Sequence, residues 1–273
     1  MRFLALAALA TSPFSIYASP ININLGTAVS FGVLAGLTIT NTGPTVINGN
    51  IGVSPGSAIT GFPPGTVTLP STEYAGAAVA ALAESDLTTA YDSAAGQPCG
   101  TSLTGQNLGG LTLTPGVYCF ASSAQLTGTL TLNAEDDPDA IFLFQLGSTL
   151  TTASSSAVDF INDTGGASVY WQVGSSATLG TDTAFQGNIL ADASITLNTG
   201  ATIQCGSALA QVGAVTLDSN TVSIETGACD SGSITGSGGG GSTTPEPSPA
   251  LLLLLIGAPY LLWRYRSLEN LRH

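Results

Sequence analysis

Threonine recurs between aliphatic residues at a nearly constant spacing along this chain. The central threonines of six such steps are 19, 18, 29, 18 and 20 residues apart. A period of this length is typical of a solenoid, in which each coil buries its apolar side only by stacking on its neighbours. Because alternate side chains of a strand take opposite faces, we expect the aliphatic residues to point inward and the threonines outward. The central row of this predicted outer wall is Thr112, Thr131, Thr149, Thr178, Thr196 and Thr216.

A wall of short hydroxyl and methyl groups could order water. Stacked coils repeat at about 4.7–4.9 Å, a spacing comparable to that of water positions in ice. Threonine is stiff at χ1, so the array would lose little side-chain entropy on contact. Two earlier steps, at 37–40 and 58–60, extend the predicted wall. The residues predicted to contact ordered water are Thr38, Thr40, Ala58, Thr60, Thr112, Thr114, Thr129, Thr131, Thr149, Thr151, Ser176, Thr178, Ser194, Thr196, Asn198, Ala214 and Thr216.

The scarcity of cationic side chains excludes several kinds of chemistry. The chain has no lysine, no arginine between Arg2 and Arg264, and only one histidine, His273. The rest of the chain therefore offers no imidazole base or ligand, no Schiff-base lysine and no arginine clamp. Nucleic acid is excluded as a partner, because its binding depends on cations and the net charge is −13. Composition predicts neither a metal nor a cofactor.

Two further families of short segments align with the threonine steps and predict the architecture. One begins at Val117, Phe142, Val169, Ile189 and Ala208, and the other at Ala157, Ala184, Thr202 and Thr221. Three edges in each coil of about 18–20 residues indicate a triangular, mainly β solenoid of about six to seven coils.

The alanine-dense segment 72–95 has no β pattern and predicts one long helix packed alongside the solenoid. Ser71 or Thr72 would cap its start, and Gly96 and Pro98 would end it. Tyr74, Ala78, Leu82 (or Ala81) and Tyr91 are expected to share roughly one face.

The ends of the chain predict export and attachment. Residues 1–18 have the charge, short apolar run and small residues of a signal peptide. A domain at 21–230 is followed by a Gly/Ser linker at 231–244 and a tail at 245–273. An apolar run at 250–263 in this tail is a candidate transmembrane segment, although it is short for one. We therefore expect a secreted or cell-surface protein.

Export permits disulfides, and the four cysteines are an even number. Nearest-neighbour pairing favours Cys99–Cys119 and Cys205–Cys229, each closing a loop of about one coil. The two other pairings remain open.

From about Leu25 to Ala228 the chain resembles the microbial ice-binding (antifreeze) proteins. The strings that carry the resemblance are Phe31–Gly36, Asn50–Gly56, Leu111–Tyr118 and Val169–Gly174. The resemblance implies a right-handed discontinuous β-solenoid with a helix alongside. It also implies a monomer that is not an enzyme, that adsorbs to ice through one flat face, and that inhibits ice growth or recrystallisation. The family's Thr-Ala/Gly-x-Thr/Asn pattern is degenerate here, because Ala, Gly or Ser replaces the leading threonine at 193–196, 213–216 and 175–178.

The tail, with Pro245-Glu246-Pro247, an apolar run and Arg264, resembles a bacterial PEP-CTERM sorting signal. This resemblance implies a sorting transpeptidase as a partner and contact with a membrane only through the tail. A plain membrane anchor is the alternative.

Two other functions compete with ice binding. A surface adhesin or structural matrix protein would use the same exported solenoid. A polysaccharide-active β-helix enzyme would need paired carboxylates, but the one acidic cluster, Glu135–Asp139, contains Pro138 and is typical of a solvated loop. Its hard oxygen ligands would suit a weak calcium site, but the spacing matches no known loop.

Overall fold

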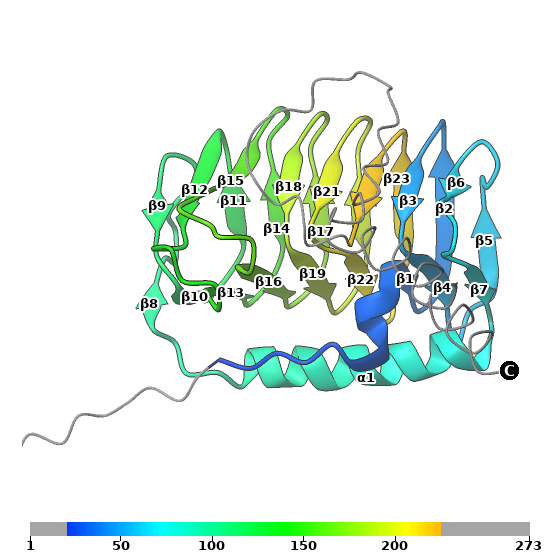
Figure 1. The fold of residues 1–273 in the computed structure, drawn as a ribbon, viewed down its shortest axis with the longest axis horizontal. Coiled ribbons are helices and arrows are strands. Elements are labelled where there is room, and N and C mark those ends of the chain that lie inside the picture. The colour runs from blue at the N-terminus through cyan, green and yellow to red at the C-terminus, as the bar shows by residue number, and fades with distance from the viewer. Residues whose placement is uncertain (1–20, 225–273) are drawn as a thin grey trace, which may run out of the picture. The chain divides into compact units, whose positions relative to one another are not determined.

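The computed structural model describes residues 21–224, which form a β-solenoid with one long helix alongside (Figure 1). The predicted signal peptide, linker and sorting tail lie outside the described residues. Within residues 21–224, no helix has the length and hydropathy needed to span a membrane.

Three parallel sheets form the sides of the solenoid; each complete coil contributes one strand to each sheet, and the coils at the two ends contribute fewer. Sheet A contains, in spatial order, β7 (Glu73–Ala75), β4 (Asn50–Val53), β1 (Phe31–Ala35), β22 (Ala208–Ala210), β19 (Asn188–Ala191), β16 (Ser168–Val173), β13 (Ile141–Leu146), β10 (Gly116–Phe120) and β8 (Thr101–Ser102). Sheet B contains β11 (Ala124–Leu126), β14 (Leu150–Thr152), β17 (Ala177–Leu179), β20 (Ile195–Leu197), β23 (Val215–Asp218), β2 (Thr38–Thr42) and β5 (Ala58–Thr60). Sheet C contains β6 (Thr66–Val67), β3 (Val46–Asn48), β24 (Thr221–Ser223), β21 (Thr202–Gln204), β18 (Ala184–Gln186), β15 (Ala157–Ile161), β12 (Thr129–Asn133) and β9 (Thr112–Leu113).

The order of the coils in space differs from their order in the chain. Strands β1, β2 and β3 pair with β22, β23 and β24, so the first coils stack on the last ones. The helix α1 (Ala78–Ala95) carries the chain from that end of the stack to the other (Figure 1). The predicted discontinuous solenoid with three edges per coil is confirmed.

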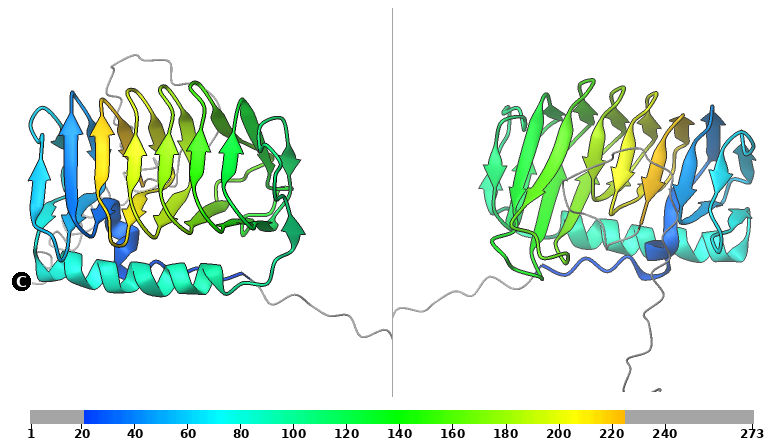
Figure 2. Two further views of the ribbon diagram at one scale, coloured as in Figure 1. Left: turned by 180° about the vertical axis from the view of Figure 1, so that it is seen from behind. Right: turned by 45° about the horizontal axis from the view of Figure 1, so that its top comes forward.

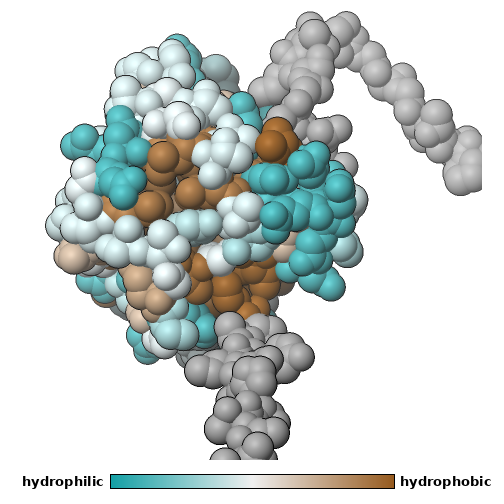
Figure 3. Space-filling view, turned by 90° about the vertical axis from the view of Figure 1, so that its left-hand side faces the viewer, coloured by the Kyte–Doolittle hydropathy of each residue, from teal (hydrophilic) through white to brown (hydrophobic). Residues whose placement is uncertain are grey.

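The interior is a continuous column of aliphatic and aromatic side chains. Phe144 stacks on Trp171 of the next coil with ring centroids 4.0 Å apart, and Trp171 contacts Phe185 on another side of its own coil. The Trp171 indole N–H donates to the Gln186 carbonyl, so this large buried ring leaves no unpaired donor. At the end of the stack formed by β8 and β9, apolar side chains show between polar loops (Figure 3), and Leu111 and Leu113 are only partly buried.

Helix α1 packs along the outer face of sheet A (Figures 1 and 2). Its buried residues are spaced three or four apart, as one face of a helix requires. Small side chains allow the helix to lie close to leucines that point out of the sheet, such as Leu190 and Leu209. The buried helix residues are Ala80, Ala83, Leu87, Ala90 and Ala94.

The predicted start and face of this helix are wrong. Glu73–Ala75 forms strand β7, which pairs with β4 and completes the edge of sheet A. Gly76 then takes a positive φ of 63°, and the helix begins only at Ala78. Leu82 is 54% exposed whereas Tyr91 packs against the buried cluster, so these two residues do not share a face.

The predicted disulfide Cys99–Cys119 is confirmed, with Cα atoms 5.9 Å apart. It joins the chain just after α1 to strand β10. The second predicted pair includes Cys229, which lies outside the described residues.

Candidate functional site

Sheet B carries one threonine in register on each of six neighbouring strands. The pairing runs from Gln125 through these threonines in the order Thr151, Thr178, Thr196, Thr216, Thr40 and Thr60. We call these six residues the threonine row. All six are exposed or half-buried, while the residues beside them, such as Ile195 and Val215, are fully buried. The alternation of a half-buried strand therefore places the row on the outer face.

No described element covers this face. Figure 2 (left) shows the strands of sheet B side by side from β5 to β11, whereas α1 lies along sheet A. The row contains no charged group. Among the strands of sheet B the only carboxylate is Asp218, which lies two residues beyond the row and accepts a hydrogen bond from the Thr199 hydroxyl.

The predicted single ladder of six threonines is wrong at three positions. Thr112 and Thr131 pair with each other in sheet C, where Thr131 is also paired with Asp159. Thr149 precedes β14, and Thr151 is the residue in register with Thr178. Both sheet B and sheet C contain threonine-rich strands. A spacing of one coil between threonines therefore does not show which sheet they belong to. Thr129 and Thr114 also leave the predicted wall, since Thr129 lies in β12 and Thr114 follows β9.

Thr149, although outside the row, and the remaining predicted residues do come together on sheet B. Thr38 and Ala58 pair beside the row, and Thr149, Ser176, Ser194 and Ala214 occupy the equivalent flank two residues before it. Asn198 directly follows β20 on the other flank.

The serines of the first flank link adjacent coils. Ser176 Oγ accepts from the Ser194 N–H at 3.3 Å, and Ser194 Oγ accepts from the Ala214 N–H at 3.2 Å. Ser123 Oγ accepts from the Thr149 hydroxyl at 2.9 Å. These groups hold the coils together at the edge of the row, so their lone pairs are partly occupied by the protein.

The prediction missed two residues of this face. Gln125 takes the row position on β11, and Thr42 pairs with Asp218 on the far flank. Gln125 was not predicted because it is not a threonine. The alternation of Ala124, Gln125 and Leu126, buried–exposed–buried, was the available signal.

The described residues hold no group of three or more side chains arranged to bind a metal ion. The acidic loop Glu135–Asp139 is exposed and leads from sheet C to sheet A. It lies in the chain between β12 and β13, so it is not part of the threonine face.

Comparison with known proteins gives a consistent result. The family model described as "Ice-binding-like" matches residues 33–223. The chain is 56% identical over 222 residues to an ice-binding protein of Nostoc sp. (strain HG1), covering 81% of each chain. A crystal structure of an ice-binding protein from the Antarctic ascomycete Antarctomyces psychrotrophicus superimposes with a TM-score of 0.69 at 42% identity, covering 74% of this chain and 98% of that one. A second, from an Antarctic biological consortium, gives a TM-score of 0.71 at 42% identity, covering 80% and 100%. The chain therefore belongs to the ice-binding-like protein family.

Proposed function

We propose that this protein adsorbs to ice through the outer face of sheet B and thereby inhibits ice growth or recrystallisation. The observation that carries the proposal is the threonine row, which is in register over six strands, uncharged and uncovered by any described element. The names of the relatives and the match to the family model support it.

The geometry gives the row the properties that ordered water requires. Neighbouring strands lie about 4.8 Å apart, so hydroxyls and methyls repeat at a fixed interval across the face. Hydroxyls can bond to ordered water almost as well as to a direct partner. The stiff χ1 of threonine and the stacked coils pre-organise the array, so adsorption orders few additional degrees of freedom.

A matched pair of tyrosine substitutions tests this proposal. Thr196→Tyr puts a large side chain in the middle of the row, where it should hold the face away from ice and remove most thermal hysteresis. Thr221→Tyr makes the same change on the exposed face of sheet C and should leave the activity as it is. Circular dichroism and thermal unfolding check that both variants fold. Equal activity of the two variants would contradict the assignment of sheet B.

We also propose that residues 1–18 direct export and that the tail 245–273 is handled by a sorting transpeptidase. The family resemblance and the composition of both ends support this view. Mass spectrometry of the mature protein in cell-surface and medium fractions would test it, and a protein that keeps both ends would contradict it. A cell-attached ice binder would also act as an adhesin to ice, so that alternative is compatible with the main proposal.

The pairing Cys205–Cys229 remains our proposal. Gly206 N–H donates to the Ser223 carbonyl, which places Cys205 beside the strand from which the chain leaves the described domain. Cys229 follows only five residues after Ile224 and is therefore within reach. Peptide mapping without reduction would identify the pair.

A further inference from the structure

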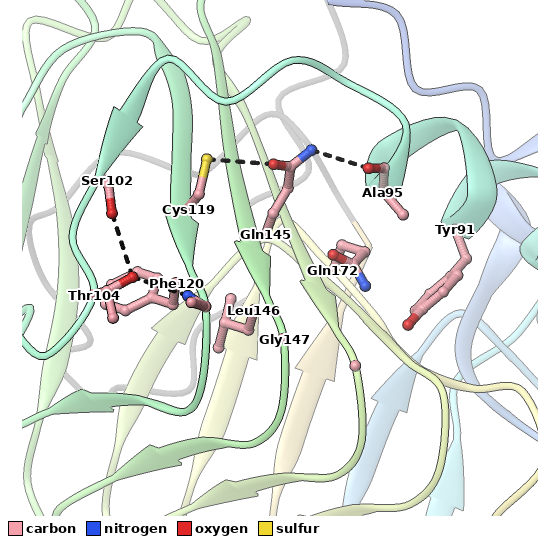
Figure 4. Close-up of a pocket in the computed structure, with 12 residues that line it drawn as sticks. Tyr91, Ala95, Ser102, Thr104, Cys119, Phe120, Gln145, Leu146, Gly147 and Gln172 are labelled. Atoms are coloured by element: carbon pink, nitrogen blue, oxygen red, sulfur yellow. Dashed lines mark hydrogen bonds between the residues drawn. The ribbon is translucent and has the colours of Figure 1, made fainter.

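A groove of about 490 Å³ lies on the outer side of sheet A, where helix α1 ends (Figure 4). Its floor is formed by the ends of β10, β13 and β16, and its sides by the last turns of α1 and by β8 with the loop after it. The four strands of sheet A that border it span about 14 Å, given a strand spacing of about 4.8 Å. It is therefore an elongated groove and does not include the threonine row.

Gln145 presents a fixed acceptor in this groove. Its side-chain N–H₂ donates to the carbonyls of Ala94 and Gln97, both at 2.8 Å, and so caps the C-terminal end of α1. These bonds fix which way the amide points, and Figure 4 shows Oε1 directed away from the helix. Oε1 lies 3.4 Å from the Cys119 sulfur, which has no hydrogen to donate because it is bonded to Cys99. Oε1 thus has no donor among the described residues.

Two hydroxyls lie across the floor from the helix. Thr104 Oγ1 accepts from the Ala121 N–H at 2.9 Å and lies 3.3 Å from Ser102 Oγ. Since the Thr104 oxygen accepts from the backbone, the pair keeps at least one hydroxyl hydrogen that can turn toward a ligand. Both residues are exposed.

Tyr91 gives the groove an aromatic wall. Its ring projects from the last turns of α1 into the groove, on the same side as Gln172 (Figure 4). Burial raises the pKa of Tyr91, so the phenol stays neutral and remains a donor. An aromatic ring next to fixed amide and hydroxyl groups offers both an apolar surface and hydrogen-bonding positions.

The charge of the lining distinguishes between classes of ligand. None of the residues that line the groove is charged, and the chain as a whole carries a net charge of −13. An acidic polymer would find no cation here, and it would be repelled by Asp92 and Asp192, whose charges act on the Tyr91 phenol. The backbone groups of the bordering strands are paired in the sheet, so an extended peptide could not add as a further strand on this face.

We propose that this groove binds a neutral oligosaccharide. Sugar hydroxyls would donate to Gln145 Oε1 and accept from Ser102 or Thr104, while an apolar sugar face packs on Tyr91. The volume lies within the usual range for a ligand site. This site would attach the protein to neutral extracellular glycan without occupying sheet B, and it does not depend on the proposed adsorption to ice.

Isothermal titration of the full chain with neutral hexasaccharides of glucose, cellohexaose and maltohexaose, tests the proposal. An alginate hexasaccharide and a blocked Ala/Gly hexapeptide serve as probes of the other ligand classes. We expect saturable binding of at least one neutral probe. Ala95→Trp, an exposed change at the end of α1, should fill the groove and weaken that binding at least ten-fold. Thr104→Val, which removes only a hydroxyl, should weaken it several-fold.

Ala81→Trp is the matched control, since it adds the same side chain to an exposed position of the helix outside the groove. It should bind the glycan as the unaltered chain does, and all variants should keep their thermal hysteresis. The proposal is wrong if no neutral probe binds saturably, if Ala95→Trp binds like Ala81→Trp, or if the alginate or the peptide binds more tightly. Loss of glycan binding with full ice activity would separate this site from the ice-binding face.

Discussion

Sheets B and C are both open faces of one solenoid and both carry threonines, yet only sheet B forms a uniform array. In sheet B every strand from β14 to β5 presents a threonine at the same register position. In sheet C, Thr131 is paired with Thr112 on one side and with Asp159 on the other. A neighbouring row of paired residues in sheet C consists of Ala184, Thr202, Thr221 and Val46, so only two of its four positions are threonine. Register and the absence of charge, rather than the number of threonines, distinguish the candidate site.

The most severe way to break this difference is to put a carboxylate into the threonine row of sheet B. Thr178→Asp puts a charge in the threonine row next to Thr151 and Thr196. A carboxylate holds water in its own hydration geometry, so we expect ice affinity to fall by about two orders of magnitude, or about 2.7 kcal/mol. Binding of the fluorescently labelled protein to single ice crystals measures this.

Thr131→Asp is the control for that change, because it adds a charge beside Asp159 on sheet C. Its ice affinity should equal that of the unaltered chain. An equal loss in both variants would show that net charge, rather than the face that carries it, governs adsorption.

A pH series separates the threonine face of sheet B from the helix that covers sheet A. Burial raises the pKa of Glu84 in α1 to about 8, and both of its carboxylate oxygens lack a hydrogen-bond partner. The native state therefore holds this proton up to about pH 8, whereas the unfolded chain loses it near the ordinary value of 4.5. The stability that depends on protonated Glu84 is complete below pH 4.5 and is lost as the pH rises toward 8. The free energy of unfolding then falls by at most about 1.4 kcal/mol per pH unit.

Urea unfolding at pH 5, 7 and 9 measures this slope. Glu84→Gln should flatten it and make the chain more stable than the unaltered one at pH 9, by about 1–3 kcal/mol. Ice affinity should stay constant over the same range, since the threonine row has no group that titrates there. If the free energy of unfolding of Glu84→Gln and of the unaltered chain changed with pH in the same way, the buried, protonated state of Glu84 would be contradicted.

The hydroxyl and the methyl of the row can be separated at Thr216. Thr216→Val keeps the branched shape and removes the hydroxyl, while Thr216→Ser keeps the hydroxyl and removes the methyl. We expect each to weaken ice affinity several-fold, about 1 kcal/mol, because both groups contribute to the ordering of water. The same pair at Thr221 in sheet C should have no effect. If only one of the two Thr216 variants lost affinity, the role of the other group would be refuted.

The architecture could be predicted from the sequence because the interior repeats more clearly than the surface. Aromatic and aliphatic runs such as Phe142–Leu146 and Val169–Val173 identify sheet A, and their spacing gives the coil length. The threonine steps do not identify their sheet, because Leu130-Thr131-Leu132 in sheet C and Ala177-Thr178-Leu179 in sheet B have the same alternation. Only the pairing partners show to which sheet a threonine-containing strand belongs. These partners depend on loop lengths, which differ from coil to coil.

The start of the helix was predicted wrongly for a related reason. Glu73-Tyr74-Ala75 has no strong preference for a strand, but the free edge of β4 offers unpaired backbone groups. Pairing with that edge outweighs local helix propensity, which amounts to a few tenths of a kcal/mol per residue. The prediction carried the helix through Gly76, the residue at which the structure has a positive φ and separates β7 from α1.

The smallest predicted effect concerns Ser194, on the flank of sheet B. Its substitution tests whether this side chain contacts ice or positions the threonine row. Its hydroxyl accepts from the Ala214 N–H, and its own N–H donates to Ser176. Ser194→Ala should therefore lower the free energy of unfolding by about 1 kcal/mol, the net contribution of such a bond. Ser122→Ala, at an exposed position near the same corner, should change it by less than about 0.5 kcal/mol. Ice affinity of the folded Ser194→Ala chain should fall less than two-fold, because the row itself is intact. A large loss of affinity with unchanged stability would instead make the Ser194 hydroxyl a contact to ice, and would extend the binding face to the flank that the threonine row now excludes.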